Sequence, residues 1–365
     1  MRVVIAPDKF AGTLSAVEAA AAIAEGWRRT APGTELTTVP MSDGGPGFVD
    51  VLHAALGGDL VAVTVPDPYG DPVPATVLRV GTTAYVESAQ AVGLHLTPSA
   101  DRDARRGSSA GVGALIRAAV EYGATRVVVG AGGTATNDGG AGLLAALGAT
   151  AGGGALDRGP DGLRGVDALD LEPARAAIAG VELVLASDVD SPLLGLFGAT
   201  KTYGPQKGLS EEDLVEVDAA LTSFADLAGR KVAAQKGAGA AGGIGYALLL
   251  LGASREPGVD VVGAAVGLDA MLAAADVVVT GEGAFDFQSR SGKVPYGVAE
   301  AAARQLVPCI ALAGQVLVGS REMRALGIEA AYSIVETYGE ERAFAAPAEA
   351  LADLAERVAR TWGRE

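Results

Sequence analysis

The sequence predicts an α/β protein of two domains, one of them built from both ends of the chain. Near each terminus, short apolar strands end in Gly-rich or Pro-containing turns and lead into helical segments, which is typical of a parallel sheet covered on both faces. The middle of the chain has hairpin-like strands instead. We therefore expect a discontinuous parallel-sheet domain at residues 1–64 and 262–365, and an inserted mixed α/β domain at residues 65–261.

The terminal domain begins with a strand, a turn and a helix. Residues 2–6 form a short, mainly apolar run that stops at Pro7, and Ser15 with Glu18 has the spacing of a capping box. The predicted apolar face of that helix is Val17, Ala20, Ala24 and Trp27. The further predicted elements are a strand at 36–40, a helix at 48–56, and strands at 277–280 and 307–313 that run into Gly-rich loops.

The middle domain begins with three short strands. They are expected at residues 61–65, 75–80 and 83–87, with a turn at 67–72. Further strands are expected at 126–129 and 181–186, and buried helices at 143–147 and 247–251.

Composition and charge exclude several classes of protein. The chain has 365 residues and a formal net charge of −16, which argues against a nucleic-acid or membrane-surface binder. Its 49% hydrophobic and 20% charged residues argue against disorder. The chain has one cysteine, Cys309, which lies in an apolar strand, and two histidines. The sequence therefore contains no Cys/His pattern typical of a zinc site. No segment reads as a signal peptide or a membrane span, so a cytoplasmic protein is expected.

A Gly-rich loop at residues 130–142 follows a strand and precedes an apolar helix. Backbone N–H groups and a helix N-terminus can bind an anion such as phosphate. Gly130, Gly132 and Ala135 also match the dinucleotide-binding turn, although no acidic residue follows at the usual distance. A tight turn without a ligand is the third interpretation.

Charged residues gather in the predicted loops. Lys9, Lys207 and Lys293, half of the chain's six lysines, lie beside Gly-rich or Pro-containing loops, where they could neutralise a bound polyanion. Seven carboxylates just after predicted strands could accept a proton, hold Mg²⁺ or cap the next helix. They are Asp8, Asp43, Asp138, Asp188, Asp190, Glu282 and Asp286.

Taken together, these loops resemble the bacterial glycerate kinase family, in its type I, glycerate 2-kinase-like branch. The resemblance covers residues 1 to about 340 in the family's order. Its motifs are Ala6-Pro-Asp-Lys-Phe10, Pro40-Met-Ser-Asp-Gly-Gly45, Gly132-Gly-Thr-Ala-Thr-Asn-Asp-Gly-Gly140, Asp188-Val-Asp-Ser-Pro-Leu193, Gly204-Pro-Gln-Lys-Gly208, and Thr280-Gly-Glu-Gly283 with Gly292-Lys293.

The resemblance implies ATP-dependent phosphorylation of D-glycerate with Mg²⁺. The reaction would occur in a cleft between a flavodoxin-like domain made of both termini and the middle domain. The expected product is 2-phosphoglycerate rather than 3-phosphoglycerate. The partners are then ATP and D-glycerate, and a homodimer is one option for the assembly.

The site residues are predicted from the motifs and their chemistry. The 130–142 loop would cradle ATP phosphates, Asp188 or Asp43 would deprotonate the hydroxyl, and the lysines would neutralise phosphate or carboxylate. The predicted catalytic residues are Asp188, Asp43, Lys9 and Lys293. The predicted substrate- and nucleotide-binding residues are Asp8, Gly44, Gly45, Gly132, Gly133, Thr134, Thr136, Asn137, Asp138, Lys207, Gly281, Glu282, Gly283 and Asp286. Asp188 and Asp190 are the candidate Mg²⁺ ligands.

Three positions depart from the family pattern, and three alternatives stay open. Ala11, Pro46 and Ala284 stand where many relatives carry Lys, Glu and Arg, which removes charge and leaves the acceptor acid undetermined. The alternatives are a kinase of a related small hydroxy acid, an NAD(P)-dependent dehydrogenase that uses the 130–135 turn, and a non-catalytic sensor. A sensor would carry a basic helix or tail, which the sequence lacks.

Overall fold

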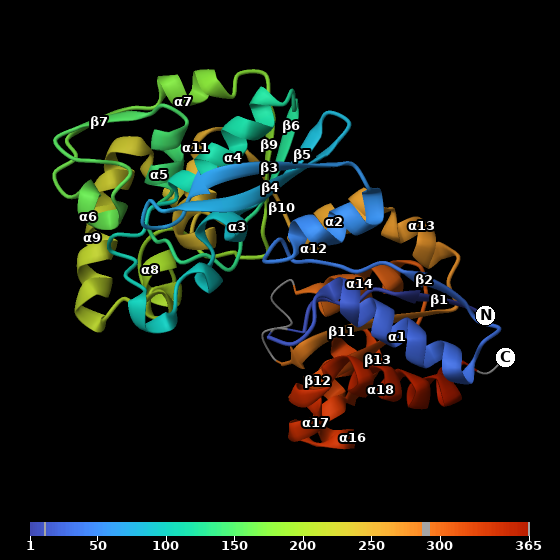
Figure 1. Cartoon of the computed structure of the whole chain (residues 1–365). Helices are drawn as coiled ribbons and strands as arrows, with labels where there is room; N and C mark the ends of the chain where they lie inside the picture. The colour runs from blue at the N-terminus through green and yellow to red at the C-terminus, as the bar shows by residue number, and fades with distance from the viewer. Residues whose placement is uncertain (11, 287–292, 364–365) are drawn as a thin grey trace. The chain divides into compact units, whose positions relative to one another are not determined.

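The computed structural model describes residues 1–10, 12–286 and 293–363. The chain divides into two compact units. Unit 1 comprises Met1–Asp43, Asp50–Gly57 and Pro257–Glu365, and unit 2 comprises Gly44–Val49 and Gly58–Glu256. Figure 1 shows the two ends of the chain, blue and red, within the same unit.

Unit 1 is built on a five-stranded sheet in which every paired strand is parallel. Its strands are β1 (Arg2–Ile5), β2 (Glu35–Thr38), β11 (Val277–Phe285), β12 (Cys309–Val316) and β13 (Ile328–Ser333). The spatial order is β13-β12-β11-β1-β2. Counted within the unit this is 2-1-3-4-5, the flavodoxin-like doubly wound order. The predicted parallel-sheet domain from both termini is confirmed.

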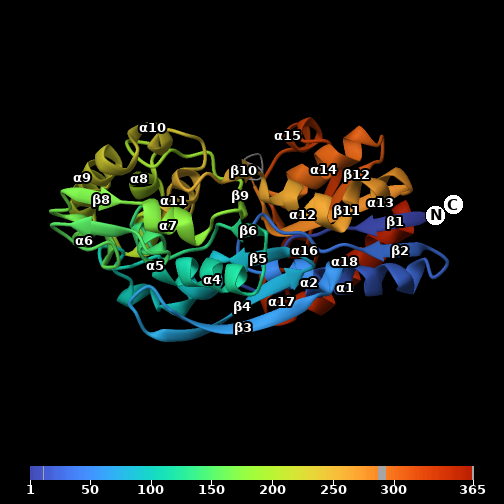
Figure 2. The ribbon, with the colours of Figure 1, turned by 90° about the horizontal axis from the view of Figure 1, so that it is seen from above.

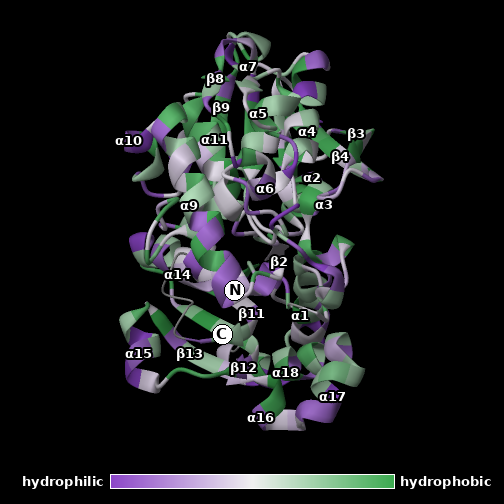
Figure 3. Cartoon of the chain, turned by 90° about the vertical axis from the view of Figure 1, so that its left-hand side faces the viewer, coloured by the Kyte–Doolittle hydropathy of each residue, from purple (hydrophilic) through white to green (hydrophobic). Residues whose placement is uncertain are grey.

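Helices cover the sheet of unit 1. They are α1 (Ala16–Thr30), α2 (Phe48–Leu56), α12 (Gly258–Val266), α13 (Leu268–Ala273), α14 (Val294–Arg304), α15 (Ser320–Ala325), α16 (Ile334–Tyr338), α17 (Glu340–Ala345) and α18 (Pro347–Trp362). Figure 2 shows α1 and α18 on one side of the sheet and α14 on the other. In Figure 3, α18 carries both green and purple residues, as a helix with one buried and one exposed face should.

Helix α1 begins where the sequence predicts. Ser15 and Glu18 form the complete capping box, which satisfies two of the unpaired N–H groups at the helix start. Trp27 is fully buried in the core that α1 shares with α18. The predicted apolar face is wrong at Val17, which is exposed, because the buried face turns toward Ala16, Ala19 and Ile23 instead.

Strand β11 is longer than the sequence predicts. The segment Gly281-Glu-Gly-Ala-Phe285, expected as a loop, continues the strand and pairs with β12. A Cβ at Gly281 would lie 2.1 Å from the carbonyl oxygen of Leu312, so only glycine allows the two strands to approach there. Glu282 is therefore held by a strand and not by a turn.

Unit 2 contains a mixed six-stranded sheet in the order β10-β9-β6-β5-β4-β3. The strands are β3 (Asp59–Pro66), β4 (Pro72–Val80), β5 (Thr83–Glu87), β6 (Arg126–Gly130), β9 (Glu182–Ala186) and β10 (Ser254–Glu256), with β7 (Thr150–Gly152) and β8 (Ala168–Asp170) in a separate pair. In the six-stranded sheet, β5, β6, β9 and β10 are parallel, and β3, β4 and β5 form the antiparallel part. Figure 2 shows β3 to β6 succeeding one another across this sheet.

Helices surround the sheet of unit 2. They are α3 (Ser88–Val92), α4 (Ala110–Glu121), α5 (Ala141–Ala146), α6 (Gly159–Leu163), α7 (Glu172–Ala177), α8 (Ala199–Tyr203), α9 (Glu211–Ala228), α10 (Arg230–Ala233) and α11 (Ile244–Leu250). Short 3-10 turns are η1 (Leu94–Leu96), η2 (Ser99–Asp101), η3 (Pro205–Lys207) and η4 (Ala240–Gly243). Most core residues are Ala, Val and Leu, with Phe224 and Tyr246 packed edge to face.

The units differ in three places from the predicted boundaries. Residues Gly44–Val49, expected in the terminal domain, belong to unit 2. The β3 strand lies in unit 2 because it pairs along its length with β4, so residues 58–64 belong there. The return to unit 1 comes at Pro257, a few residues earlier than predicted. Within the described ranges, no helix has both the length and the apolar sequence that crossing a membrane requires.

Candidate functional site

The carboxyl ends of β1 and β11 form the switch point of the sheet of unit 1. In doubly wound sheets, ligands bind where the strand order reverses, outside the carboxyl ends of the strands. The N–H of Asp8 donates to the carbonyl oxygen of Gly281 over 2.8 Å, which fixes the residues after β1 against β11. Asp8 and Glu282, both buried, therefore lie at this switch point.

Asp8 has the most unusual environment of these carboxylates. Its pKa is raised to about 7, chiefly by burial; the positive charge of Lys9 lowers it, and the negative charges of Asp43 and Glu282 raise it. A carboxyl group with a pKa near neutrality can both accept and release a proton at physiological pH.

Two lysines hold the carboxylates of this switch point together. Lys9 Nζ lies 3.7 Å from Asp8 Oδ1 and 3.4 Å from Asp43 Oδ1. Lys293 Nζ lies 3.6 Å from Glu282 Oε2 and 3.5 Å from Asp286 Oδ1. The structure thus brings together six of the predicted site residues, from four separate segments, in unit 1. Both lysines are only partly exposed, so their charges are incompletely screened by water.

In unit 2, Asp138 organises the Gly-rich loop from within. Its buried carboxylate accepts hydrogen bonds from the N–H and hydroxyl of Ser109, both 2.8 Å, and from the N–H groups of Gly140 (3.0 Å) and Gly142 (3.1 Å). Burial raises its pKa, and these bonds act in the opposite direction. The start of α5, which the sequence suggested as a phosphate site, therefore already holds the protein's own carboxylate.

Lys207 is buried beneath the same loop. Its Nζ donates to the carbonyl oxygen of Thr136 over 2.6 Å and to Thr134 Oγ1 over 3.4 Å. Burial lowers its pKa to about 7, although the charge of Asp138 acts in the opposite direction. Lys207 thus fixes the backbone of the loop, and its charge is not exposed to solvent.

Two buried polar atoms of the loop have no hydrogen-bond partner among the residues that the structure describes. They are Thr136 Oγ1 and Asn137 Oδ1, whereas the Asn137 amide donates to Thr200 Oγ1 over 2.8 Å. Buried polar atoms are nearly always satisfied by protein, water or ligand. This loop therefore has unused hydrogen-bonding capacity next to a fixed backbone.

A segment that the sequence motifs did not identify supports this loop. The glycines and alanines at 237–243, considered only as a loop before a helix, pack directly on it. A Cβ at Gly242 would lie 1.9 Å from the carbonyl oxygen of Thr136, and Ala241 adopts φ 52°. The repeated small residues were the signal that another backbone approaches closely.

The turn at residues 44–46 packs against the start of the Gly-rich loop. A Cβ at Gly132 would lie 2.9 Å from the Cα of Gly45, and one at Gly133 would lie 2.7 Å from Pro46 Cγ. Pro46, which replaces a charged residue of the family pattern, thus contributes packing at this position. Glu87, which no sequence motif identified, is buried at the end of β5 and accepts the N–H of Val49 over 3.2 Å.

The candidate metal ligands Asp188 and Asp190 follow β9 and differ in environment. Asp190 Oδ2 accepts from Lys236 Nζ over 3.0 Å, and Asp190 Oδ1 accepts from the Arg255 guanidinium over 2.7 Å. The bond from Lys236 and the charge of Arg255 lower the Asp190 pKa. Among the described residues, no group of three or more His, Cys, Asp or Glu is placed to hold a metal ion.

Several other predicted residues can be placed. Cys309 is buried in β12, as its apolar strand predicts, and burial raises the pKa of its thiol. Gly283 lies in β11, one residue beyond Glu282. Ala284 also lies in β11, paired with Gln315. Ala11 and Gly292 lie outside the described residues.

The fold and the switch point define a class of protein: a two-unit α/β protein with a cluster of carboxylates and lysines at the switch point of its parallel sheet. The profile of the glycerate kinase family matches residues 3–363. A Bacillus subtilis glycerate kinase is 41% identical over 92% of this chain and 90% of its own length. The glycerate 2-kinase of Escherichia coli strain K12 is 39% identical over 93% of this chain and 92% of its own length.

A solved structure agrees with these relatives. The crystal structure of a protein assigned as glycerate kinase 2 from Salmonella typhimurium LT2 matches with a TM-score of 0.84 and 38% identity, over 100% of this chain and 98% of that one. The chain belongs to the glycerate kinase family. It is thus placed in a family of enzymes, as its motifs predicted, and the family favours the kinase over the dehydrogenase and the sensor.

Proposed function

We propose that the protein phosphorylates D-glycerate with ATP and forms 2-phosphoglycerate. Support comes from the family and from relatives named glycerate kinase and glycerate 2-kinase. The observation in this chain that carries the proposal is the buried carboxyl group of Asp8 at the switch point, beside Lys9.

Asp8 takes the part of the general base in this proposal. Its ionised carboxylate accepts the proton of the attacking hydroxyl, the hydroxyl oxygen bonds to the γ-phosphorus, and the bond to the β-phosphate oxygen breaks, so that ADP leaves. Asp8 then returns the proton to solvent. A pKa of about 7 suits both steps at neutral pH. Asp43 and Asp188, predicted as the base from sequence, become the comparison variants.

Lys9 and Lys293 supply positive charge in unit 1. Each lysine lies 3.4 to 3.7 Å from two carboxylates and is partly exposed, so its ammonium group is already positioned when an anion arrives. We propose that these two lysines bind the glycerate carboxylate and the transferred phosphoryl group. The transition state of phosphoryl transfer is stabilised mainly by such positioning and charge.

Only one of the two predicted ligands suits the Mg²⁺ ion that is expected with ATP. Both oxygens of Asp190 already accept from Lys236 and Arg255, so Asp190 is a poor ligand as it stands. Asp188 remains the candidate, because Mg²⁺ often takes one protein carboxylate together with phosphates and waters. When bound, the ion would neutralise the charge of the phosphates.

Phosphorus NMR of the purified protein with Mg-ATP and D-glycerate tests the proposal. A 2-phosphoglycerate signal that depends on Asp8 supports it, with Asp50→Asn on the exposed surface as the control variant. A 3-phosphoglycerate signal would support the kinase activity but contradict 2-phosphoglycerate as the product. Turnover with a related hydroxy acid but not with D-glycerate would overturn the substrate, and would direct attention to Pro46 and Ala284.

A further inference from the structure

Strand β3 is the outermost strand of the six-stranded sheet of unit 2. It pairs with β4 along its whole length in an unbroken register, and its other side faces no strand within the described part of the chain. Figure 2 shows β3 along the margin of unit 2. An exposed edge strand presents unpaired N–H and C=O groups on which another strand can pair.

The hydrogen bonds of the hairpin show which backbone groups of β3 face outward. In an antiparallel pair, residues that bond to the partner strand alternate with residues whose N–H and C=O groups point away from it. Thr76, the partner of Ala62, donates its N–H to Gln90 Oε1 over 2.7 Å and not to β3. The pair at Ala62 is therefore a non-bonded one. By the same alternation, the N–H and C=O groups of Leu60, Ala62 and Thr64 point away from β4.

Two further observations agree with this alternation. Pro74, the partner of Thr64, has no N–H that it can donate to β3. Just beyond the strand, the N–H of Asp67 donates to the carbonyl oxygen of Asp71 over 2.7 Å, which continues the bonded pairs of the odd-numbered positions. The even-numbered residues of β3 thus form the free edge.

This edge lacks the features that usually protect edge strands. Such features are charged side chains, a proline within the strand, a bulge or a very short length. Strand β3 has a charged residue only at its first position and a proline only at its last. By contrast, β10 at the other edge of the same sheet has three residues, among them Arg255 and Glu256. The β3 edge is therefore suited to being covered by another strand.

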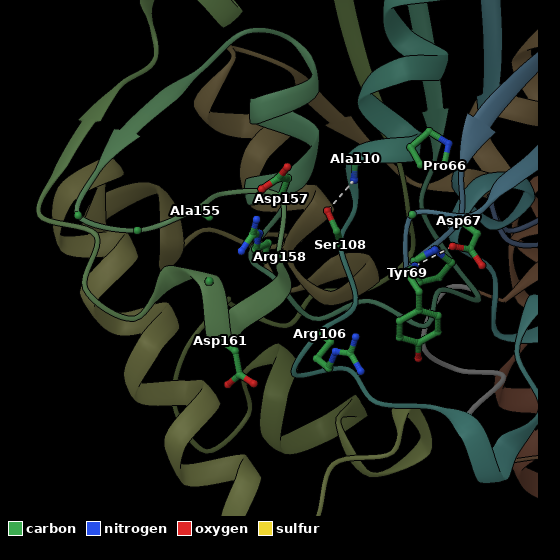
Figure 4. Close-up of a pocket in the computed structure, with 15 residues that line it drawn as sticks. Pro66, Asp67, Tyr69, Arg106, Ser108, Ala110, Ala155, Asp157, Arg158 and Asp161 are labelled. Carbon is green, nitrogen blue, oxygen red and sulfur yellow. Dashed lines mark hydrogen bonds between the residues drawn. The ribbon is translucent and has the colours of Figure 1, made fainter.

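A groove of about 400 Å³ lies between β3 and α4. The α4 residues that line it are Ala110, Ala114, Arg117, Ala118 and Glu121. Figure 4 shows Pro66 and Ala110 where this groove meets the neighbouring cavity, at the end of the edge strand. Arg117 and Glu121 are exposed, and neither forms an ion pair or a side-chain hydrogen bond with a described residue. Their charges are available to a partner that lies along β3.

Arg117 and Glu121 lie on opposite sides of Ala62 along the direction of the strand. Helix α4 begins beside Pro66, because a Cβ at Gly111 would lie 2.2 Å from the carbonyl oxygen of Pro66. Counted from there along the helix, Arg117 is about 9 Å away and Glu121 about 15 Å away. Ala62 is about 13 Å back from Pro66 along β3. A two-fold axis at Ala62 therefore passes between the two charges.

We propose that two copies of this chain associate through β3, edge to edge and antiparallel, about a two-fold axis at Ala62. In this register Ala62 faces Ala62 of the partner subunit, and Leu60 faces Thr64 of the partner subunit. The outward N–H and C=O groups of all three residues are then paired. The same axis brings Arg117 of each copy to Glu121 of the partner subunit, so the surface is complementary to itself in charge as well as in backbone hydrogen bonding. The inference is independent of the proposed function.

Sedimentation velocity of the full chain over a range of micromolar concentrations tests the association. We expect a species of twice the mass of the chain. Ala62→Lys places two like charges opposite each other on the axis and should weaken dimerisation by about tenfold or more. Because the Ala62 side chain is exposed, the fold should persist. Ala176→Lys adds the same charge at an exposed position of α7 and, as the matched control, should leave the dimer unchanged.

Charge reversal on α4 tests the position of the axis. Arg117→Glu and Glu121→Arg should each weaken the dimer by about threefold to tenfold, because like charges then meet across the interface. The double variant exchanges the two charges and should restore dimerisation. A general effect of net charge would not produce this recovery. A double variant as weak as the single variants would contradict the pairing of these two positions across the axis.

Cysteines on the edge test the register without altering charge. Facing residues of an antiparallel pair lie about 5.5 Å apart at Cα, so Ala62→Cys should form a disulfide-linked dimer under mild oxidation. Thr64→Cys, on the same face of β3, is the control, because the two new cysteines would be about 14 Å apart. The buried Cys309 should not react. A chain that stays monomeric, a dimer insensitive to Ala62→Lys, or preferential cross-linking at Thr64→Cys overturns the proposal.

Discussion

The N–H of Asp8 bonds to the carbonyl oxygen of Gly281 over 2.8 Å, across the central pair of strands in unit 1. This single bond places the residues that follow β1 beside Glu282 on β11. The Asp8 side chain is consequently buried next to other negative charges and protonates near pH 7.

Asp8→Asn should lower kcat by roughly 10²–10⁴, because the hydroxyl loses its proton acceptor. In the unaltered protein, kcat/KM for D-glycerate should fall about tenfold per pH unit below a pKa of about 7, since protonated Asp8 cannot accept a proton. Steady-state rates from pH 5 to 9 measure both effects. A variant that retains a third of the turnover would remove Asp8 from the mechanism, and Asp43→Asn and Asp188→Asn would then be the next comparisons.

The same substitution should change the pH dependence of stability. The Asp8 pKa rises from 3.8 unfolded to about 7 folded, so the folded state binds more protons between these values and loses stability as the pH rises through them. Asn does not titrate. The unfolding free energy of Asp8→Asn relative to the unaltered protein should therefore increase by up to about 1.4 kcal/mol per pH unit from pH 4 to 7. Urea unfolding at several pH values tests this, and a difference independent of pH would contradict it.

Lys207→Met should change the pH dependence of stability in the opposite direction, and at higher pH. Burial lowers the Lys207 pKa from 10.5 to about 7, so the unfolded state binds more protons between these values and the folded protein gains stability as the pH rises through them. The variant lacks this gain. Its stability relative to the unaltered protein should fall between pH 7 and 10 in a denaturant series, and Lys231→Met on the exposed surface should show no such trend.

Asp138→Asn should destabilise unit 2 by about 2–4 kcal/mol. The carboxylate accepts four hydrogen bonds, and an amide nitrogen in the place of Oδ2 would face the donors of Ser109 and Gly142. Thermal unfolding measures the loss. Asp190→Asn, which removes a charge from an exposed ion pair, should cost less than about 1 kcal/mol. Equal losses in both variants would show that the buried bonds contribute little.

Gly281→Ala should destabilise unit 1 and disturb Glu282. The new Cβ would lie 2.1 Å from the Leu312 carbonyl oxygen, so β11 and β12 must separate. Gly263→Ala in α12 is the control, because its nearest neighbour would be 3.5 Å away and alanine favours a helix. We expect a loss of more than about 2 kcal/mol for the first and none for the second by chemical denaturation. A stable Gly281→Ala variant would contradict the close approach of the strands.

Local patterns in the sequence determined much of the secondary structure. Ser15 and Glu18 mark the start of α1, and alternating apolar residues mark β3, β4 and β5, because capping and side-chain periodicity act over a few residues. The terminal parallel sheet could be predicted for the same reason: each apolar run ends in a turn and leads into a helix. The family motifs likewise identified the residues that meet at the switch point.

Only the tertiary structure determines which of those residues form hydrogen bonds and ion pairs with one another and which are buried. The Asp138 carboxylate accepts the N–H of Gly142 at the start of α5 and also the N–H of Ser109, which lies 29 positions earlier in the chain than Asp138. The pairing of Lys293 with Glu282 and the burial of Asp8 depend on strands far apart in the sequence. A pKa, an ion pair or a cavity is set by atoms that long-range packing brings together, and no short window of sequence contains them.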